Sequence, residues 1–543
     1  MYKTRMKNAL RPIATDTHDF PSLRQAGKIY VDKTMFIHQL VTDASSSLFI
    51  ISRPRRFGKS LTVSALKALF QGRRDLFKGL AIEKTDWKWQ KFPVIHFEFN
   101  DVATTSLDEF KSAFAAHVRE RLEDAGYAYD ESLTPYDNFG RAIESLSARN
   151  AAGGRKAHSG VAILIDEYDA PIGQCLDDIA KAEAVRDILS ALYSKMKNRT
   201  GDIRFLFMTG VSKFTKLSVF SALNNLVDVS QDDRFATMFG YTDEELTANF
   251  DEHLRAHAKK MGRPYGEYRA EMKRWYNGFR FAKGDATTVY NPISIALTLY
   301  AKDSGGFTAT WATTGRPSML MNYLRREDLV ALDYENMTGV ADAEFDVADL
   351  RNLTAVALLY QSGYLTIKDY DADGECYTLG VPDEEIRRDL ATLVTGVAAD
   401  STDAWAANLG KALINAKWPQ FFAGLKSLYA HMPYGALEGT VHEHSYGRIL
   451  CTLLASQGIA YRAEDVQSNG RADVVAEYNK GVFIFELKVG KKVDREFRQI
   501  RRKGYAAPYM AQGKPIWLIG LCFDKATRRL VDCAAAPLVV VSG

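Results

Sequence analysis

The chain has 543 residues, 46% hydrophobic and 25% charged, with a formal net charge of +3. This length predicts about three or four domains, the composition is that of soluble globular proteins, and the small net charge excludes a global attraction to nucleic acid, so such binding would need local basic patches. Five widely spaced cysteines without a Cys-x-x-Cys pair argue against a disulfide framework or a zinc ribbon. The sequence shows no signal segment and no apolar run of bilayer length. These features together favour a cytoplasmic protein without a membrane partner.

The first motif follows a predicted buried strand at residues 47–51. Residues 53–60 read Arg-Pro-Arg-Arg-Phe-Gly-Lys-Ser and lead into a helical pattern, which is the order of a phosphate-binding P-loop. Backbone N–H groups and the helix N-terminus of such a loop bind phosphate oxygens. We therefore expect Lys59 to reach the β- and γ-phosphates of ATP and Ser60 to ligate one Mg²⁺. Arg53 stands where the general motif has its first glycine.

A second apolar strand, residues 160–165, ends in an Asp-Glu pair, which is the pattern of a Walker B motif. Asp166 is expected to complete the Mg²⁺ shell, and Glu167 is the predicted catalytic residue that polarises the hydrolytic water. The alternative for residues 58–60 is a plain helix N-cap. The P-loop and the Walker B strand together favour a nucleotide site over that alternative. The residues predicted to bind ATP are Arg55, Arg56, Phe57, Gly58, Lys59, Ser60 and Asp166.

A third strand, residues 204–208, ends in a polar segment that we expect beside the first two motifs. Thr209 and Ser212 are the sensor candidates, because either hydroxyl could contact the γ-phosphate or the water. Lys213 and Arg234 are candidates for a charged finger acting in cis or in trans. For Lys213 the alternative is a solvated strand end.

The middle of the chain is predicted to connect two functional regions. Residues 241–340 are mainly helical and indicate a lid, after an ATPase core at 1–240. Residues 341–430 form a predicted connector, within which residues 350–400 give helix, hairpin and helix. This outline resembles a winged-helix module, which binds DNA in some proteins and packs domains together in others. Asp371 and Asp373 are interpreted as turn residues, because further calcium ligands do not follow. The remainder, residues 431–543, forms the predicted C-terminal domain.

Two apolar strands, residues 472–476 and 482–489, flank turn residues and predict a hairpin. Glu486 and Lys488 share one face of the second strand, and strand pairing can bring Asp473 alongside. Two carboxylates and an ammonium favour a site for one or two Mg²⁺ ions, which suits phosphodiester hydrolysis. Solvated charges on an edge hairpin are the alternative, but the apolar residues around Glu486 suggest a covered strand, where unpaired charge is costly.

Helices are predicted before and after this hairpin, and basic residues cluster in the second one. The cluster is expected either to hold a nucleic-acid backbone or to be a solvated helix face; its members are Lys488, Lys491, Lys492, Arg495, Arg498, Arg501, Arg502 and Lys503. The order helix, strand, strand, helix over residues 435–530 resembles the PD-(D/E)XK nuclease superfamily. The resemblance implies Asp473 and Glu486 as metal ligands and Lys488 as a catalytic residue that orients water or stabilises the transition state. It also implies accessory roles for Glu443, Gln499 and Tyr505.

The chain as a whole resembles the AAA-ATPase-like family that is commonly fused to such a nuclease domain. The resemblance is carried by residues 30–34, 53–60, 164–171, 209–214, 275–281, 289–292 and 361–367. It includes the Arg-Pro-Arg-Arg-Phe-Gly-Lys form of the P-loop, so Arg53 departs from the general motif and not from the family. The implied fold class is α/β: an AAA-like P-loop NTPase with a helical lid and a winged-helix-like module, then an α/β nuclease-like domain.

Three functional hypotheses remain open from the sequence. The first is an ATP-binding and ATP-hydrolysing protein whose ATPase gates or drives a Mg²⁺-dependent DNA nuclease. The second is a nucleotide-controlled signalling switch whose C-terminal domain binds nucleic acid or a partner without cleaving. The third is a nucleotide-independent nuclease whose ATPase serves assembly. DNA is the expected partner, RNA is not distinguished from it, and a homo-oligomer is left open.

Overall fold

The computed structural model describes most of the chain, and it divides into two compact units. The first unit comprises Met1–Thr308 and Asn336–Asp383, and the second comprises Ala309–Glu335 and Glu384–Gly543. The domain boundaries expected near residues 240, 340 and 430 stay predictions. The described residues are 10–15, 18–152, 159–212, 223, 225–301, 306–311, 334–345, 350–352, 354–399, 403–430, 443–467, 470–490 and 506–539.

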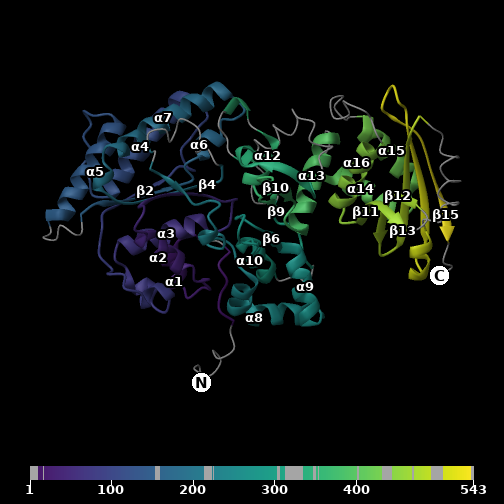
Figure 1. The fold of residues 1–543 in the computed structure, drawn as a ribbon, viewed down its shortest axis with the longest axis horizontal. Helices are drawn as coiled ribbons and strands as arrows, with labels where there is room; N and C mark the ends of the chain where they lie inside the picture. The colour runs from purple at the N-terminus through teal and green to yellow at the C-terminus, as the bar shows by residue number, and fades with distance from the viewer. Residues whose placement is uncertain are drawn as a thin grey trace, which may run out of the picture. The chain divides into compact units, whose positions relative to one another are not determined.

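A five-stranded parallel sheet forms the centre of the first unit (Figure 1). Its order is β2-β3-β4-β1-β5, so β4 lies between β1 and β3. The three long motif-bearing strands are continuous apolar runs and are buried almost throughout, as expected for a parallel sheet covered on both faces. The strand bounds are β1 Leu48–Ser52, β2 Val94–Glu98, β3 Val161–Asp166, β4 Ile203–Gly210 and β5 Val227–Asp228.

Helices lie on both sides of this sheet. In Figure 1, α1, α2 and α3 lie on one side and α4, α5 and α7 on the other. Two of the long helices begin at capping side chains, since Ser106 accepts the N–H of Glu109 and Asp178 accepts that of Lys181. The bounds are α1 Phe20–Gln25, α2 Thr34–Thr42, α3 Lys59–Phe70, α4 Leu107–Asp124, α5 Pro135–Ala152, α6 Ala170–Gly173 and α7 Ile179–Lys197.

The predicted lid is helical with one short antiparallel strand pair, β6·β7. Its helices pack around a common core that includes Phe250, Leu254, Trp275 and Tyr290. The bounds are α8 Asp243–Lys260, α9 Tyr265–Tyr276, β6 Asn277–Phe279, β7 Val289–Tyr290 and α10 Pro292–Tyr300.

A partly buried ion pair joins the start of α8 to the N-terminal region of the chain. The Lys33 ammonium lies 2.6 Å from both carboxylate oxygens of Glu245 and donates to the Thr237 carbonyl at 2.7 Å. Glu245 also closes a capping box, because it accepts the N–H of Thr242 while the Thr242 hydroxyl accepts its own N–H. Burial lowers the pKa of Lys33, and the Glu245 carboxylate opposes that shift.

Glu245→Ala is therefore expected to destabilise the first unit by about 3 kcal/mol, because it leaves a buried ammonium without its carboxylate and removes a helix cap. Urea denaturation followed by circular dichroism measures the loss. Glu244→Ala is the matched control, since Glu244 is exposed on the same turn. Equal losses in the two variants would contradict a special role for the Lys33 pair.

A three-stranded antiparallel sheet of order β8-β10-β9 completes the first unit. The predicted helix, hairpin and helix are present: α12, then β9 and β10, then α13 (Glu384–Ala399), which begins the last segment of the second unit. The Asp371 carboxylate accepts the N–H groups of Asp373 and Gly374 at 3.0 and 3.2 Å, which confirms the turn interpretation. The bounds are β8 Met337–Ala341, α12 Ala355–Gln361, β9 Thr366–Asp371 and β10 Cys376–Gly380.

The second unit carries a five-stranded sheet of order β11-β12-β13-β14-β15, in which only the pair β13·β14 is parallel. Aromatic contacts of Trp418 with Phe483 and of Phe421 with Phe485 show that α15 covers one face of β13. Across the described residues, no helix is long and apolar enough to span a membrane. The bounds are α13 Glu384–Ala399, α14 Asp403–Ile414, α15 Trp418–Ala430, α16 Glu443–Ser456, β11 Ala460–Gln467, β12 Gly470–Tyr478, β13 Gly481–Val489, β14 Ile516–Phe523 and β15 Leu530–Val539.

Candidate nucleotide site and candidate nuclease site

The carboxyl ends of β1, β3 and β4 meet at one edge of the first sheet, because the strands are parallel and adjacent. The P-loop follows β1, turns at Arg56 and Gly58 with φ of 69° and 98°, and enters α3 at Lys59. At Gly58 an added Cβ would meet open space, but the backbone conformation is one that other residues rarely adopt. The loop thus has the tight turn and the open helix N-terminus that phosphate binding requires.

The Lys59 side chain is folded into the P-loop. It is 5% exposed, and its ammonium donates to the carbonyl oxygens of Arg53 at 2.9 Å and Pro54 at 3.0 Å. Burial lowers the pKa of Lys59, and nearby carboxylates oppose that shift. These carboxylates belong to Asp166, Glu167 and Asp169.

Asp166 and Thr209 contact each other across neighbouring strands. Asp166 is buried at the end of β3, and its Oδ1 accepts a hydrogen bond from the Thr209 hydroxyl and another from the Glu167 N–H at 3.0 Å. Glu167 has a left-handed backbone with φ of 50°. Burial raises the pKa of Glu167, while the charge of Lys59 lowers it.

The oxygens available at this edge fit Mg²⁺, which prefers carboxylate and hydroxyl ligands and shares its shell with phosphates. Asp166 supplies a carboxylate, and Ser60, partly exposed in the first turn of α3, supplies a hydroxyl. The structure brings Asp166 together with Lys59, Glu167 and Thr209, and Ser60 follows Lys59 in the first turn of α3. Their roles remain predictions.

Ser212 is held mainly through its backbone. Its N–H donates to Asp169 Oδ2 at 2.6 Å, and its carbonyl accepts the Tyr168 hydroxyl at 2.7 Å. Tyr168 and Asp169 were not assigned a role from the sequence. The signal available was their position directly after the Walker B pair. The finger candidate Lys213 lies outside the described residues.

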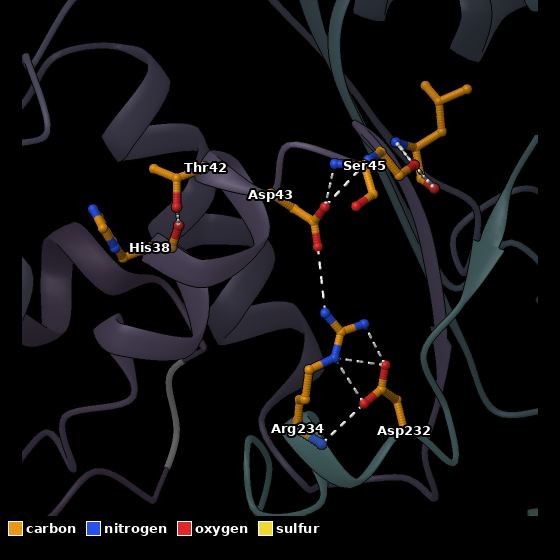
Figure 2. A network of polar contacts seen from close by, with 8 residues as sticks. His38, Thr42, Asp43, Ser45, Asp232 and Arg234 are labelled. Carbon is orange, nitrogen blue, oxygen red and sulfur yellow. Dashed lines mark hydrogen bonds and ion pairs between the residues drawn. The ribbon is translucent and has the colours of Figure 1, made fainter.

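The other finger candidate, Arg234, is engaged with two carboxylates, those of Asp232 and Asp43 (Figure 2). Its guanidinium binds the Asp232 carboxylate, with Nη2 to Oδ2 at 2.6 Å, and its Nη1 lies 3.5 Å from Asp43 Oδ2. Asp43 lies in the segment that enters the amino end of β1, whereas the P-loop leaves the carboxyl end. A finger role for Arg234 in trans stays a hypothesis.

Arg53, at the place of the usual first glycine, is a buried anchor. Its Nη1 donates to the Ser230 carbonyl at 2.5 Å, its Nη2 to the Phe235 carbonyl at 3.3 Å, and its guanidinium lies 4.3 Å from the ring centre of Phe281. Burial lowers the pKa of Arg53 to about 10. The arginine therefore fills space beneath the loop that a glycine would leave empty.

Phe57 is a second buried residue of the same loop, and it shares the partner Phe281 with Arg53. Its ring packs edge-on against Phe279 and Phe281 of the lid, with centroid distances of 4.8 and 5.3 Å. Within the predicted ATP-binding set, Phe57 thus makes a packing contact, because it is only 2% exposed.

In the second unit, the predicted hairpin is formed by β12 and β13, with Val474 paired to Phe485. Asp473 Oδ2 accepts the N–H of Leu487 at 2.7 Å, so the carboxylate reaches across to β13. The Lys488 ammonium lies 3.3 Å from Glu486 Oε1 and 3.5 Å from Asp473 Oδ2. The structure therefore brings the three predicted catalytic groups together.

This site is sheltered from solvent. Glu486 is 2% exposed and Lys488 is 7% exposed, whereas Asp473 is partly exposed. The ammonium bridges the two carboxylates, which shows that the pair forms a place for positive charge. Two carboxylates with such a place between them fit the oxygen-rich ligand set of Mg²⁺.

The accessory predictions are largely outside what the structure describes. Glu443 begins α16, and its side chain is not described. Gln499, Tyr505 and the basic cluster from Lys491 onward lie outside the described residues. Among the described part of the chain, no group of three or more His, Cys, Asp or Glu side chains is arranged to hold a metal ion.

Comparisons with known proteins agree with this arrangement. Residues 12–220 match the family of predicted AAA-ATPases, and residues 441–533 match the PD-(D/E)XK nuclease superfamily. A protein of Azotobacter chroococcum mcd 1, described as "Uncharacterized protein in vnfD 5'region", is 32% identical over 538 residues, covering 96% of this chain and 97% of that protein. The chain belongs to the AAA-ATPase-like family with a C-terminal PD-(D/E)XK nuclease domain.

This membership confirms the resemblance and the α/β fold class predicted from the sequence. The AAA-ATPase-like match contains the predicted P-loop, the predicted Walker B pair and both sensor candidates, Thr209 and Ser212. The PD-(D/E)XK match contains Asp473, Glu486 and Lys488. Both candidate sites therefore lie within regions that define the family.

Proposed function

We propose that the protein is an ATP-hydrolysing, Mg²⁺-dependent DNA nuclease, in which the nucleotide state of the P-loop controls cleavage in the second unit. The observation that carries this proposal is the sheltered carboxylate pair of Asp473 and Glu486 bridged by the Lys488 ammonium. Two carboxylates on neighbouring strands with one ammonium between them supply the oxygen ligands and the cationic helper that metal-dependent cleavage of a phosphodiester would need.

At the nuclease site, Asp473 and Glu486 would hold one or two Mg²⁺ ions. A bound Mg²⁺ supplies a hydroxide nucleophile and neutralises charge that develops on the phosphate. Lys488 would then turn from the carboxylates to orient the water or to stabilise the charge of the transition state. Because Lys488 lies on the same strand face as Glu486, its ammonium would remain beside the metal ligands in this role.

At the nucleotide site, Lys59 would exchange the carbonyls of Arg53 and Pro54 for the β- and γ-phosphates of ATP. Ser60 and Asp166 would hold one Mg²⁺, and Glu167 would polarise the attacking water. Burial raises the pKa of Glu167 toward neutral pH. A carboxylate with a raised pKa is a stronger proton acceptor, which supports this role.

Glu167→Gln tests this function. The variant is expected to bind ATP with an affinity within about threefold of wild type and to hydrolyse it roughly 100-fold more slowly. The variant therefore remains bound to ATP. Its rate of cleaving linear, circular and single-stranded DNA with Mg²⁺ should differ between the ATP-bound and the nucleotide-free protein.

The wild-type measurements separate the alternatives. Equal cleavage rates with and without nucleotide would contradict control by the P-loop. That result would favour a nuclease whose ATPase serves assembly, and sedimentation with and without ATP would reveal the assembly. No cleavage of any substrate, together with slow hydrolysis and tightly held ADP, would favour the signalling switch.

A further inference from the structure

The Asp169 side chain is a buried carboxylate that the proposed chemistry does not use. It follows the Walker B pair at the start of the short helix α6 and is 5% exposed. Burying a carboxylate is costly unless hydrogen bonds or charges compensate. Its partners therefore indicate what the chain gains from placing it there.

Those partners are backbone N–H groups at the end of β4. Both oxygens of Asp169 lie 3.1 Å from the Val211 N–H nitrogen, and Oδ2 also accepts the Ser212 N–H at 2.6 Å. These residues directly follow Gly210, the last residue of β4, so the carboxylate binds the chain where it leaves the sheet.

The neighbouring Tyr168 binds the same segment from both directions. Its N–H donates to the Thr209 carbonyl at 3.1 Å, and its hydroxyl donates to the Ser212 carbonyl at 2.7 Å. Gly210 permits this close approach, because a Cβ there would lie 2.4 Å from Asp169 Oδ1. The segment from Thr209 to Ser212 is thus held on both sides of a glycine.

Thr209 is the residue that this attachment would orient. Its hydroxyl donates to Asp166, the predicted Mg²⁺ ligand. A shift of the β4 end would move that hydroxyl, since Thr209 precedes Gly210 directly.

We propose that Asp169 is a positioning residue for ATP hydrolysis: its carboxylate fixes the end of β4 so that the Thr209 hydroxyl stays on Asp166. This inference rests on the proposed ATPase function. Asp169 itself would not touch the nucleotide. Its substitution is expected to slow turnover without weakening nucleotide binding, which depends on the P-loop.

The test compares Asp169→Asn, Thr209→Val and the double variant in the full-length protein. The asparagine keeps one acceptor oxygen but turns an N–H donor toward the Val211 or Ser212 N–H. We expect kcat for ATP to fall about tenfold or more, with the Kd for ADP within about threefold of wild type. When Thr209→Val is already present, adding Asp169→Asn should lower kcat by less than about threefold, because the two residues act through one contact.

Asp177→Asn is the matched control, because Asp177 is exposed on the segment after α6; it should keep the wild-type rate. Thermal denaturation verifies that each variant is folded. Wild-type kcat in folded Asp169→Asn, or full multiplication of the two losses in the double variant, would overturn the proposal. A wild type that binds ATP without turnover would overturn the ATPase function as well, and the wild-type rate alone reveals that case.

Discussion

Glu486→Gln is expected to abolish DNA cleavage and to leave basal ATP turnover unchanged. The substitution replaces a 2% exposed carboxylate by a neutral amide of the same shape, so one of two charged metal ligands is lost. Loss of several kcal/mol of transition-state stabilisation corresponds to a decrease of roughly 10³-fold or more in cleavage rate. The measurement is cleavage of linear, circular and single-stranded DNA with Mg²⁺ or Mn²⁺.

Glu477→Gln provides the control for this experiment. Glu477 lies on the adjacent strand β12 and pairs with Arg462 at 3.4 Å, away from the Asp473 end of the hairpin. The same chemical change there should leave cleavage within about twofold of wild type. Cleavage by purified Glu486→Gln at the wild-type rate would refute the assignment of the nuclease site.

Lys59→Met is expected to weaken ATP and ADP binding by roughly 100-fold. The buried ammonium now bonded to the Arg53 and Pro54 carbonyls is the cation that phosphates would take over, and charge-assisted hydrogen bonds contribute about 1.5–3 kcal/mol each. Isothermal titration with each nucleotide measures the effect. Methionine has a similar length, so the core beneath α3 should remain filled.

Lys67→Met is the control, since Lys67 lies in the last turn of the same helix, far from its N-terminus. It should bind nucleotide as wild type does. Unchanged affinity in Lys59→Met would refute the P-loop interpretation. Comparing cleavage by Lys59→Met with that by Glu167→Gln would further separate a requirement for bound ATP from one for hydrolysis.

The elements that carry both sites were predictable because their signals are local. An apolar run that ends in Asp166 and Glu167 predicts a buried strand with polar side chains at its carboxyl end. The hairpin of Asp473 and Glu486 was likewise encoded by two apolar runs around turn residues. The position of β4 between β1 and β3 confirmed the expected neighbourhood of Thr209 and Asp166.

The contacts that fix these elements were not predictable, because their partners are distant in sequence. Lys33 and Glu245 are separated by 212 residues, and Arg53 binds carbonyls 177 and 182 residues away, at Ser230 and Phe235. Nothing in the local pattern of Arg53 distinguishes a buried anchor from a phosphate-binding arginine. Asp169 was missed for the same reason, since its partner N–H groups, at Val211 and Ser212, directly follow another strand, β4.

The division of the first unit into two chain segments has a consequence for synthesis on the ribosome. The unit is completed only by Asn336–Asp383, after the chain has passed through Ala309–Glu335 of the second unit. For example, the N–H of Arg280, next to strand β6, donates to the Thr366 hydroxyl at 2.7 Å. This hydrogen bond can form only after Thr366 has been synthesised. At the usual pace of translation this wait is on the order of ten seconds. During that time the residues of the candidate nucleotide site have been synthesised, but the unit that contains them still lacks Asn336–Asp383. A chain truncated after Thr308 would lack this segment of the first unit altogether.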